Sequence, residues 1–284
     1  RFGRMDEKYP KVTPATFESD TDITCETPEM RRGGTVWVEV TLNGFDYSES
    51  GIEYTFAIPP QVKSISPVSG LEVGGTIMKV DGLNFLNTEG LGCLIGGVFV
   101  KARWLSSEEL LCTTPAAVSG PGVVNMQVTQ NGEHFTRDRF MFQYDAVPNL
   151  FSSSPLSGST VGGTRVIIYG TGFKQSNDME CKFGVDVVYA RWLTHESIVC
   201  VAPSCQPGRV ALSVSLNGQD FTSSDLYYDY LLTATVVSVS PTMGSYLGGT
   251  QVTVHGFDFK NSSKLACRFG SKLGDVKFVD SENI

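Results

Sequence analysis

Cysteine is the residue type with the clearest chemistry in this sequence. Two pairs have the same spacing of 19 residues: Cys93 with Cys112, and Cys181 with Cys200. Matching pairs predict one disulfide per repeat of an extracellular chain. Zinc binding is the alternative, but a single pair of cysteines per domain supplies too few ligands.

The remaining three cysteines lack a partner at this spacing. Counting the same interval from Cys267 lands just beyond Ile284, so we expect its partner there. Because Arg1-Phe2-Gly3 resembles Lys182-Phe183-Gly184, which follows a cysteine, we expect the partner of Cys25 just before Arg1, in a loop about six residues longer than the others. Cys205 is left over, and its role is open. Closing a loop of about 20 residues stabilises a domain by roughly 3 kcal/mol in the chain-entropy description.

Other residues that could do chemistry have simpler explanations. The histidines lie at non-equivalent positions without Cys or His neighbours at ligand spacing, which predicts no metal site. They are His134, His195 and His255. Glu18, Asp20 and Asp22 suggest a cation site, but a solvated loop is the favoured interpretation. No nucleophile recurs with a general base, so we expect neither an enzyme nor a cofactor.

The elements that position the cysteines belong to an internal repeat of about 87 residues. Each copy carries Ser-Pro, Gly, Gly-Gly-Thr and Gly-x-x-Phe, and its later half carries Asn-Gly. Gly-Gly-Thr lies at 74–76, 162–164 and 248–250, and Asn-Gly at 43–44, 131–132 and 217–218. The glycine pairs predict tight turns, because no following lysine and helix complete a phosphate-binding loop.

We therefore divide the chain into four repeats. Repeat 1 (1–58) is the C-terminal part of a unit, repeat 2 (59–146) and repeat 3 (147–232) are complete, and repeat 4 (233–284) is an N-terminal part. The joining segments leave almost no linker, which predicts neighbours that abut in a semi-rigid rod.

Hydrophobic residues alternate with polar ones after each Gly-Gly-Thr, as at Met78 and Val80, and again before each Asn-Gly. A period of two with one apolar face is typical of half-buried antiparallel strands. Asn-Gly is expected to close a tight hairpin with positive φ at both positions. About seven strands per repeat would form a Greek-key sandwich.

The order of these motifs resembles the IPT/TIG domain, an immunoglobulin-like fold of the E-set type found in plexins, related receptors and certain transcription factors. The resemblance covers essentially the whole chain and implies tandem all-β sandwiches. Trp104 and Trp192, each eight residues before a cysteine, are expected to pack against the disulfides; Phe17 and Phe278 occupy the same position in the partial repeats.

Composition narrows the function. The net charge of −8 and the pI near 5.0 argue against nucleic acid as a partner. No run is long and apolar enough to cross a bilayer, and residues 1–10 lack the apolar core of a signal peptide.

The leading hypothesis is a non-catalytic extracellular or cell-surface protein, structural or adhesive, such as a fibre component. Its partners would be proteins, including copies of itself. The alternative is the stalk of a plexin-like or growth-factor-receptor-like signalling receptor. An accessory module of a secreted carbohydrate-active enzyme is a third hypothesis.

Two kinds of surface site complete the expectations. Asn261-Ser262-Ser263 is a complete glycosylation sequon. Trp37, Ile167 and Tyr169 fall on the outward-facing set of their strands and are candidate interface residues, since exposed aromatic residues are enriched in binding hot spots. Coverage by a neighbouring loop of the same repeat is the alternative.

Overall fold

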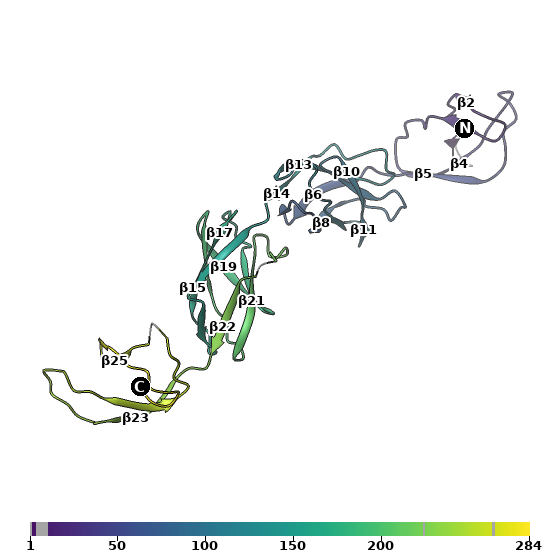
Figure 1. The fold of residues 1–284 in the computed structure, drawn as a ribbon. Helices are drawn as coiled ribbons and strands as arrows, with labels where there is room; N and C mark the ends of the chain where they lie inside the picture. Colours follow the sequence, from purple (N-terminus) through teal and green to yellow (C-terminus); the bar gives the residue numbers. More distant parts are fainter. Residues whose placement is uncertain (1, 4–10, 224, 263–264) are drawn as a thin grey trace. The chain divides into compact units, whose positions relative to one another are not determined.

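The computed structural model describes residues 2–3, 11–223, 225–262 and 265–284 (Figure 1). These residues form strands, turns and loops, and no helix occurs among them. The all-β prediction is confirmed. In the described part of the chain, nothing helical has the length and apolar character needed to cross a membrane.

The two partial repeats contain small sheets. Repeat 1 holds a three-stranded sheet in the order β1-β4-β5 and the hairpin β2-β3; repeat 4 holds the pairs β23-β24 and β25-β26. The bounds are β1 Phe2–Gly3, β2 Ala15–Phe17, β3 Ile23–Cys25, β4 Gly34–Val38, β5 Ile52–Phe56, β23 Thr235–Ser240, β24 Thr253–Phe257, β25 Cys267–Phe269 and β26 Lys272–Gly274.

Repeat 2 is built from two sheets. One has the order β11-β12-β8-β6 and the other the order β10-β9-β13-β14-β7. The bounds are β6 Gln61–Ser66, β7 Ser69–Leu71, β8 Ile77–Leu83, β9 Gly92–Ile95, β10 Val98–Lys101, β11 Arg103–Trp104, β12 Glu109–Thr113, β13 Gly122–Thr129 and β14 Phe140–Asp145.

Repeat 3 has the same strand succession in one continuous sheet, β15-β17-β20-β19-β18-β21-β22-β16. The long strand β19 joins the two halves of this sheet, because its first residues pair with β18 and its later residues pair with β20. The bounds are β15 Asn149–Ser154, β16 Ser157–Ser159, β17 Arg165–Thr171, β18 Glu180–Phe183, β19 Asp186–Thr194, β20 Ser197–Val201, β21 Gly208–Ser215 and β22 Tyr227–Leu231.

Among the residues that the structure describes, the complete repeats contain more strands than the expected seven: nine in repeat 2 and eight in repeat 3. The first strand of each repeat is divided: β6 and β15 pair antiparallel with β8 and β17, while β7 and β16 pair in parallel with the last strand, β14 or β22. Repeat 2 gains one more strand because β10 and β11 are separate where repeat 3 has the single β19.

Burial follows the alternation read from the sequence. Met78 and Val80 are fully buried, and Ile77 beside them is exposed. The core of repeat 3 gathers Val166, Ile168, Phe173, Met179, Cys181, Phe183, Ile198, Cys200, Ala202, Leu212, Val214, Leu216, Tyr228 and Tyr230. A strand buried on one face forms because its apolar side chains leave water together.

The repeated glycines are places where the backbone and side chains approach too closely for a Cβ atom. A Cβ on Gly70 would lie 2.0 Å from Oγ1 of the buried Thr76, the last residue of Gly-Gly-Thr. A Cβ on Gly82 would lie 2.4 Å from Cζ of Phe85, the aromatic of Gly-x-x-Phe. The motif glycines therefore make room for the threonine and the phenylalanine that follow them.

The expected Asn-Gly hairpin is wrong in detail. Only the glycine has positive φ, 79° at Gly132, and Asn131 does not. The Asn131 side chain instead accepts hydrogen bonds from the backbone N–H groups of Glu133 and His134, at 3.1 and 2.9 Å. These bonds hold a wider loop, 130–134, between the bridged residues Thr129 and Phe135.

Candidate functional site

The first cross-link joins the two sheets of repeat 2. Cys93 on β9 is bonded to Cys112 on β12, with their Cα atoms 6.3 Å apart, and both side chains are fully buried. Cys93 lies opposite Val128 on β13, and Cys112 lies opposite Met78 on β8. The disulfide therefore ties one sheet to the other through the centre of the core.

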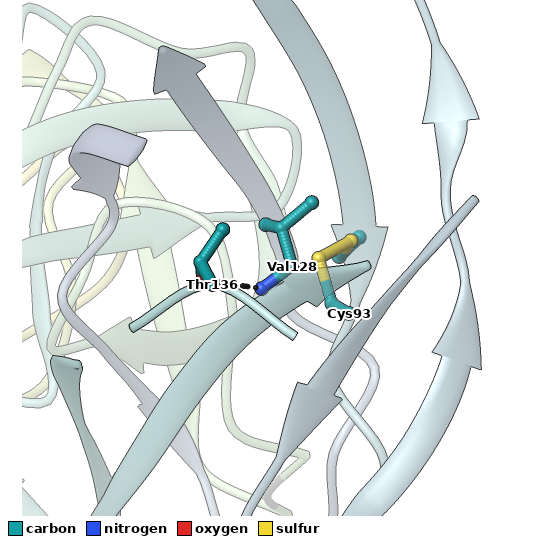
Figure 2. The surroundings of a disulfide bond; sticks show 4 residues. Cys93, Val128 and Thr136 are labelled. Atoms are coloured by element: carbon teal, nitrogen blue, oxygen red, sulfur yellow. Dashed lines mark hydrogen bonds between the residues drawn. A yellow bond between two sulfur atoms is a disulfide. The ribbon is translucent and has the colours of Figure 1, made fainter. Parts of the chain in front are cut away.

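The backbone beside this disulfide is held by a threonine (Figure 2). The buried Thr136 Oγ1 accepts a hydrogen bond of 3.1 Å from the Val128 N–H, and the Thr136 N–H donates to the Val128 carbonyl at 2.8 Å. The second half of the Asn-Gly loop is thereby fastened to the strand that covers Cys93.

Repeat 3 reproduces this arrangement. Cys181 on β18 is bonded to Cys200 on β20, with the Cα atoms 6.4 Å apart and a sequence separation of 19. Val214 lies opposite Cys181, and its N–H donates to Thr222 Oγ1 at 3.1 Å. The two complete repeats thus share a cross-linked core with the same supporting hydrogen bond.

Aromatic rings from the last strand fill the core beside each disulfide. The rings of Phe142 and Tyr144 meet edge to face at 5.1 Å, as do those of Tyr228 and Tyr230 at 5.1 Å. The Tyr144 hydroxyl donates to the Pro115 carbonyl at 2.7 Å. Burial raises the pKa of the Tyr144, Tyr228 and Tyr230 hydroxyls, because the charged phenolate would lose its hydration.

The other three cysteines carry no disulfide within the described residues. Cys25 is exposed, and Cys205 and Cys267 are half-buried. Cys205 packs against the core of repeat 3. The predicted bonds of Cys25 and Cys267 to residues outside the sequence stay a prediction.

The expected packing of the tryptophans on the disulfides is wrong for Trp104. This residue lies on β11, the edge strand of its sheet, and 38% of it is exposed. Its Nε1 donates to the Phe85 carbonyl at 3.1 Å, so the indole lies at the edge of the sheet and partly in solvent. Trp192, on the continuous β19, packs against the core that contains Cys181 and Cys200.

The histidines and acidic residues set aside at the sequence level lie on the surface. His134, His195 and His255 are exposed and far apart in the sequence. Asp22 accepts hydrogen bonds from the Thr21 and Ser19 hydroxyls, at 2.6 and 3.0 Å, and these bonds lower its pKa. In the ranges described, no three His, Cys, Asp or Glu residues are grouped so as to hold a metal ion.

The candidate interface residues differ in exposure. Tyr169 on β17 is 40% exposed, whereas Ile167 on the same strand and Trp37 on β4 are half-buried. Asn261 is exposed, while Ser263 of its sequon lies outside the described residues. Their roles in an interface and in glycosylation stay predictions.

Two features escaped the sequence analysis. The threonines that fasten the Asn-Gly loops follow the aromatic residue in both complete repeats, as Phe135-Thr136 and Phe221-Thr222, and this shared dipeptide was the available signal. The first residues of β19 form an exposed apolar edge, for which the alternation of Val185, Val187 and Tyr189 was the signal.

Comparison with known families decides what these cross-linked sandwiches are. The family described as "IPT/TIG domain" matches residues 60–144, 148–230 and 234–284. The chain belongs to the IPT/TIG domain family. The resemblance read from the motif order is confirmed, and with it the immunoglobulin-like fold.

IPT/TIG relatives among curated proteins are much longer. Human fibrocystin-L is 27% identical over 247 residues, which cover 84% of this chain and 6% of fibrocystin-L. Rat plexin-A3 is 26% identical over 214 residues, covering 69% of this chain and 11% of plexin-A3. The chain therefore spans about a tenth or less of these relatives.

A solved structure of the full extracellular region of plexin A4 is also similar. It has 19% sequence identity, covers 79% of this chain and 20% of the plexin chain, and has a TM-score of 0.46.

The IPT/TIG repeats described here are extracellular or at the cell surface, as their two internal disulfides and their fibrocystin-L and plexin relatives indicate.

Proposed function

We propose that this IPT/TIG chain is a non-catalytic spacer in an extracellular structural or adhesive protein. One observation carries the proposal. In repeat 3, β16 pairs in parallel with the last strand β22, and Ser159 lies opposite Leu231. The chain thus leaves the repeat beside Ser159, at the far end from Asn149, where it enters (Figure 1).

The length of this offset follows from strand geometry. The segment from Asn149 to Ser159 runs in one direction, and at about 3.3 Å per residue it spans roughly 30 Å. A domain that the chain enters at one end and leaves at the other adds its own length to a tandem array. This supports a spacing role.

The connections between repeats are short. Residues 57–60, 146–148 and 232–234 separate the last strand of one repeat from the first strand of the next. Segments of this length leave little freedom for neighbouring domains to separate. The disulfides add resistance to unfolding under load, because the residues between the bonded cysteines cannot extend.

The second candidate function is the stalk of a plexin-like or growth-factor-receptor-like signalling receptor. The similarity to plexin-A3 favours it. The chain is also similar to fibrocystin-L, which is not a plexin, so the similarity alone does not choose between the two functions. The complete polypeptide distinguishes the two functions. A propeller domain upstream and a cytoplasmic kinase or GTPase-activating domain downstream support the receptor stalk.

Further parts of the proposal concern boundaries and partners. The division at 1–58, 59–146, 147–232 and 233–284 is proposed for the domains, and the family matches at 60–144, 148–230 and 234–284 support it. Proteins, rather than nucleic acids, are the proposed partners, because the net charge is −8. Asn261 is the proposed glycosylation site.

Small-angle X-ray scattering of the complete chain tests the spacer function. A compact domain of this length has a radius of gyration of roughly 19 Å. The spacer proposal predicts a value well above this, and the value should not change when salt is raised. A radius of gyration near that of a compact domain contradicts the spacing role.

A further inference from the structure

One outer surface of repeat 3 combines two arginines with apolar side chains. It lies on β17, β20 and β19, on the side away from the core, because the alternate residues Val166, Ile168 and Cys200 are buried inside. Both arginines, the tyrosine and one valine of this surface are exposed. We call it the basic face, and it consists of Arg165, Ile167, Tyr169, Arg191 and Val201.

The register of the strands sets the spacing of the two arginines. Arg165 lies opposite Val201, and Arg191 lies opposite Val199, two residues away on the same strand β20. Because neighbouring strands lie about 4.8 Å apart and each residue advances about 3.4 Å, the Cα atoms of the arginines are about 12 Å apart. Ile167 also lies opposite Val199. Apolar side chains therefore lie between the two charges.

Neither arginine is neutralised within the chain. Arg165 and Arg191 form no ion pair or side-chain hydrogen bond with another residue that the structure describes. The chain has 30 Asp and Glu against 22 Lys and Arg, so two unpaired cations on one face run against its overall charge. Arginine and tyrosine are enriched in protein interfaces and in their binding hot spots.

Repeat 2 covers the equivalent face differently. Aligned on Gly-Gly-Thr, Lys79 and Asp81 occupy the positions of Ile167 and Tyr169. The Lys79 Nζ lies 3.0 Å from a carboxylate oxygen of Asp81 and 2.6 Å from one of Glu109. The charges of that face are therefore satisfied by one another. Repeat 3 has no such cluster among its described residues, which leaves its face ready for a partner.

The hairpin β2-β3 of repeat 1 has the complementary composition. Its loop carries Glu18, Asp20 and Asp22, which are three carboxylates within five residues that include no lysine or arginine. Phe17 and Ile23 lie opposite each other where the loop begins and ends, and both are exposed. Opposite side chains of a hairpin project from the same side, so two apolar groups lie beside the carboxylates. We call β2, β3 and their loop the acidic hairpin.

The loop of the acidic hairpin is held in one conformation. The Glu18 and Ser19 N–H groups donate to the Asp22 carbonyl at 3.1 and 3.0 Å. The Asp22 carboxylate accepts hydrogen bonds from the Ser19 and Thr21 hydroxyls, which lower its pKa and keep it charged at neutral pH. A loop that is ordered before binding loses little conformational entropy when it binds.

We propose that the acidic hairpin of one copy of this chain binds the basic face of repeat 3 in a second copy. The carboxylates of the hairpin face Arg165 and Arg191, and its two apolar side chains cover the apolar residues between them. A symmetric contact between two basic faces is excluded, because it would bring the arginines of both copies together. Charge complementarity therefore selects an acidic occupant, and the second copy supplies one.

This contact joins two unlike surfaces. Because each copy carries both the acidic hairpin and the basic face, the contact can be repeated from copy to copy, and it gives an open assembly unless it closes into a ring. It goes beyond the spacer function, which needs no self-association. Few residues take part, so a single contact is weak. Many copies held on one surface would strengthen it through their high effective concentration.

Sedimentation equilibrium of the complete chain tests the self-association. We expect reversible association at low salt that weakens as salt is raised. Arg165→Glu/Arg191→Glu should weaken it about tenfold or more, because like charges then meet. Lys101→Glu/Arg103→Glu is the matched control, since it reverses two exposed charges on repeat 2. The cysteines without a disulfide are changed to serine to prevent covalent association: Cys25, Cys205 and Cys267.

Two results of this experiment overturn the proposal. One is a native chain that stays monomeric at low salt up to about 1 mM, the weakest affinity of interest. The other is equal weakening by the basic-face variant and by its control. The thermal midpoints of the variants should match that of the native chain, because the substituted side chains are exposed.

Mixing charge-reversed copies tests the pairing itself. Glu18→Lys/Asp20→Lys reverses the acidic hairpin and should also weaken association about tenfold or more. Each double variant alone has two surfaces of the same sign, whereas a mixture with Arg165→Glu/Arg191→Glu regains an acidic hairpin opposite a basic face. The mixture should therefore associate, and its failure to do so overturns the proposal. Scattering at concentrations where the copies are separate still reports the spacing role, so the two proposals fail separately.

Discussion

Removing the disulfide of repeat 3 should destabilise that repeat by about 3 kcal/mol. The bond between Cys181 and Cys200 closes a loop across 19 residues, for which the chain-entropy description gives about 3 kcal/mol. In a repeat of this size, each kcal/mol moves the thermal midpoint by about 4–8 °C. We therefore expect Cys181→Ala/Cys200→Ala to lower the midpoint of repeat 3 by about 12–24 °C.

The unfolding of repeat 3 can be followed separately. The chain has three tryptophans, and in a Trp37→Phe/Trp104→Phe background only Trp192 remains, packed against the core of repeat 3. Its fluorescence then reports this repeat within the complete chain. The assay is thermal and urea unfolding with and without the double cysteine substitution.

The matched control removes the equivalent disulfide of repeat 2. Cys93→Ala/Cys112→Ala should change the Trp192 transition by no more than about 0.5 kcal/mol, because distant sites act independently. A loss below about 1 kcal/mol for the repeat 3 pair, against the expected 3, would refute the reasoning. Equal losses of stability in the Trp192 transition for the two cysteine pairs would refute it too, because each cross-link would then not stabilise its own repeat alone.

The remaining predictions concern buried polar groups, close packing, pH and the surface. Thr222→Val should lower the free energy of unfolding in urea by about 1–3 kcal/mol, because the buried Val214 N–H, which donates to Thr222 Oγ1, loses its acceptor. Thr222→Ser keeps the hydroxyl; it is the control and should be nearly neutral. Gly82→Ala should cost at least about 1–3 kcal/mol, because the new methyl group meets the backbone carbonyl of β6 and the Phe85 ring. The buried tyrosines have raised pKa values, so the folded state holds their protons more tightly; stability should be fully present below about pH 10 and fall above it, with phenolate absorbance rising as unfolding occurs. Trp37→Ser and Tyr169→Ser should weaken assembly with little change in thermal midpoint if these residues lie in an interface, whereas a large loss of stability with assembly intact would place them inside their own repeats.

The strands and the cross-links could be predicted from the sequence because their signals are local and repeated. Met78 and Val80 show the two-residue period that burial of one face imposes, and the equal cysteine spacing recurs in two copies. Repetition separated these patterns from chance, since the same residues reappear in the same order.

The errors arose where tertiary position decides the outcome. Asn131 was expected at positive φ from its dipeptide, but its side chain accepts two backbone hydrogen bonds and keeps the residue out of the left-handed region. Trp104 was expected in the core, but it lies on the edge strand β11 and is 38% exposed. The continuity of β19 from its pairing with β18 to its pairing with β20 required knowledge of which strand pairs with which, and spacing alone does not give it.

The most direct test of the spacer function is a distance measured across repeat 3 in the complete chain. Spin labels placed by unnatural amino acids at Phe151 and Leu232 would mark the two ends, and both positions are exposed. The parallel pairing of β16 with β22 predicts a single narrow distance of about 25–30 Å. A distance below about 15 Å, half of what the strand length requires, would show that the chain enters and leaves repeat 3 at the same end, and would contradict the spacing role.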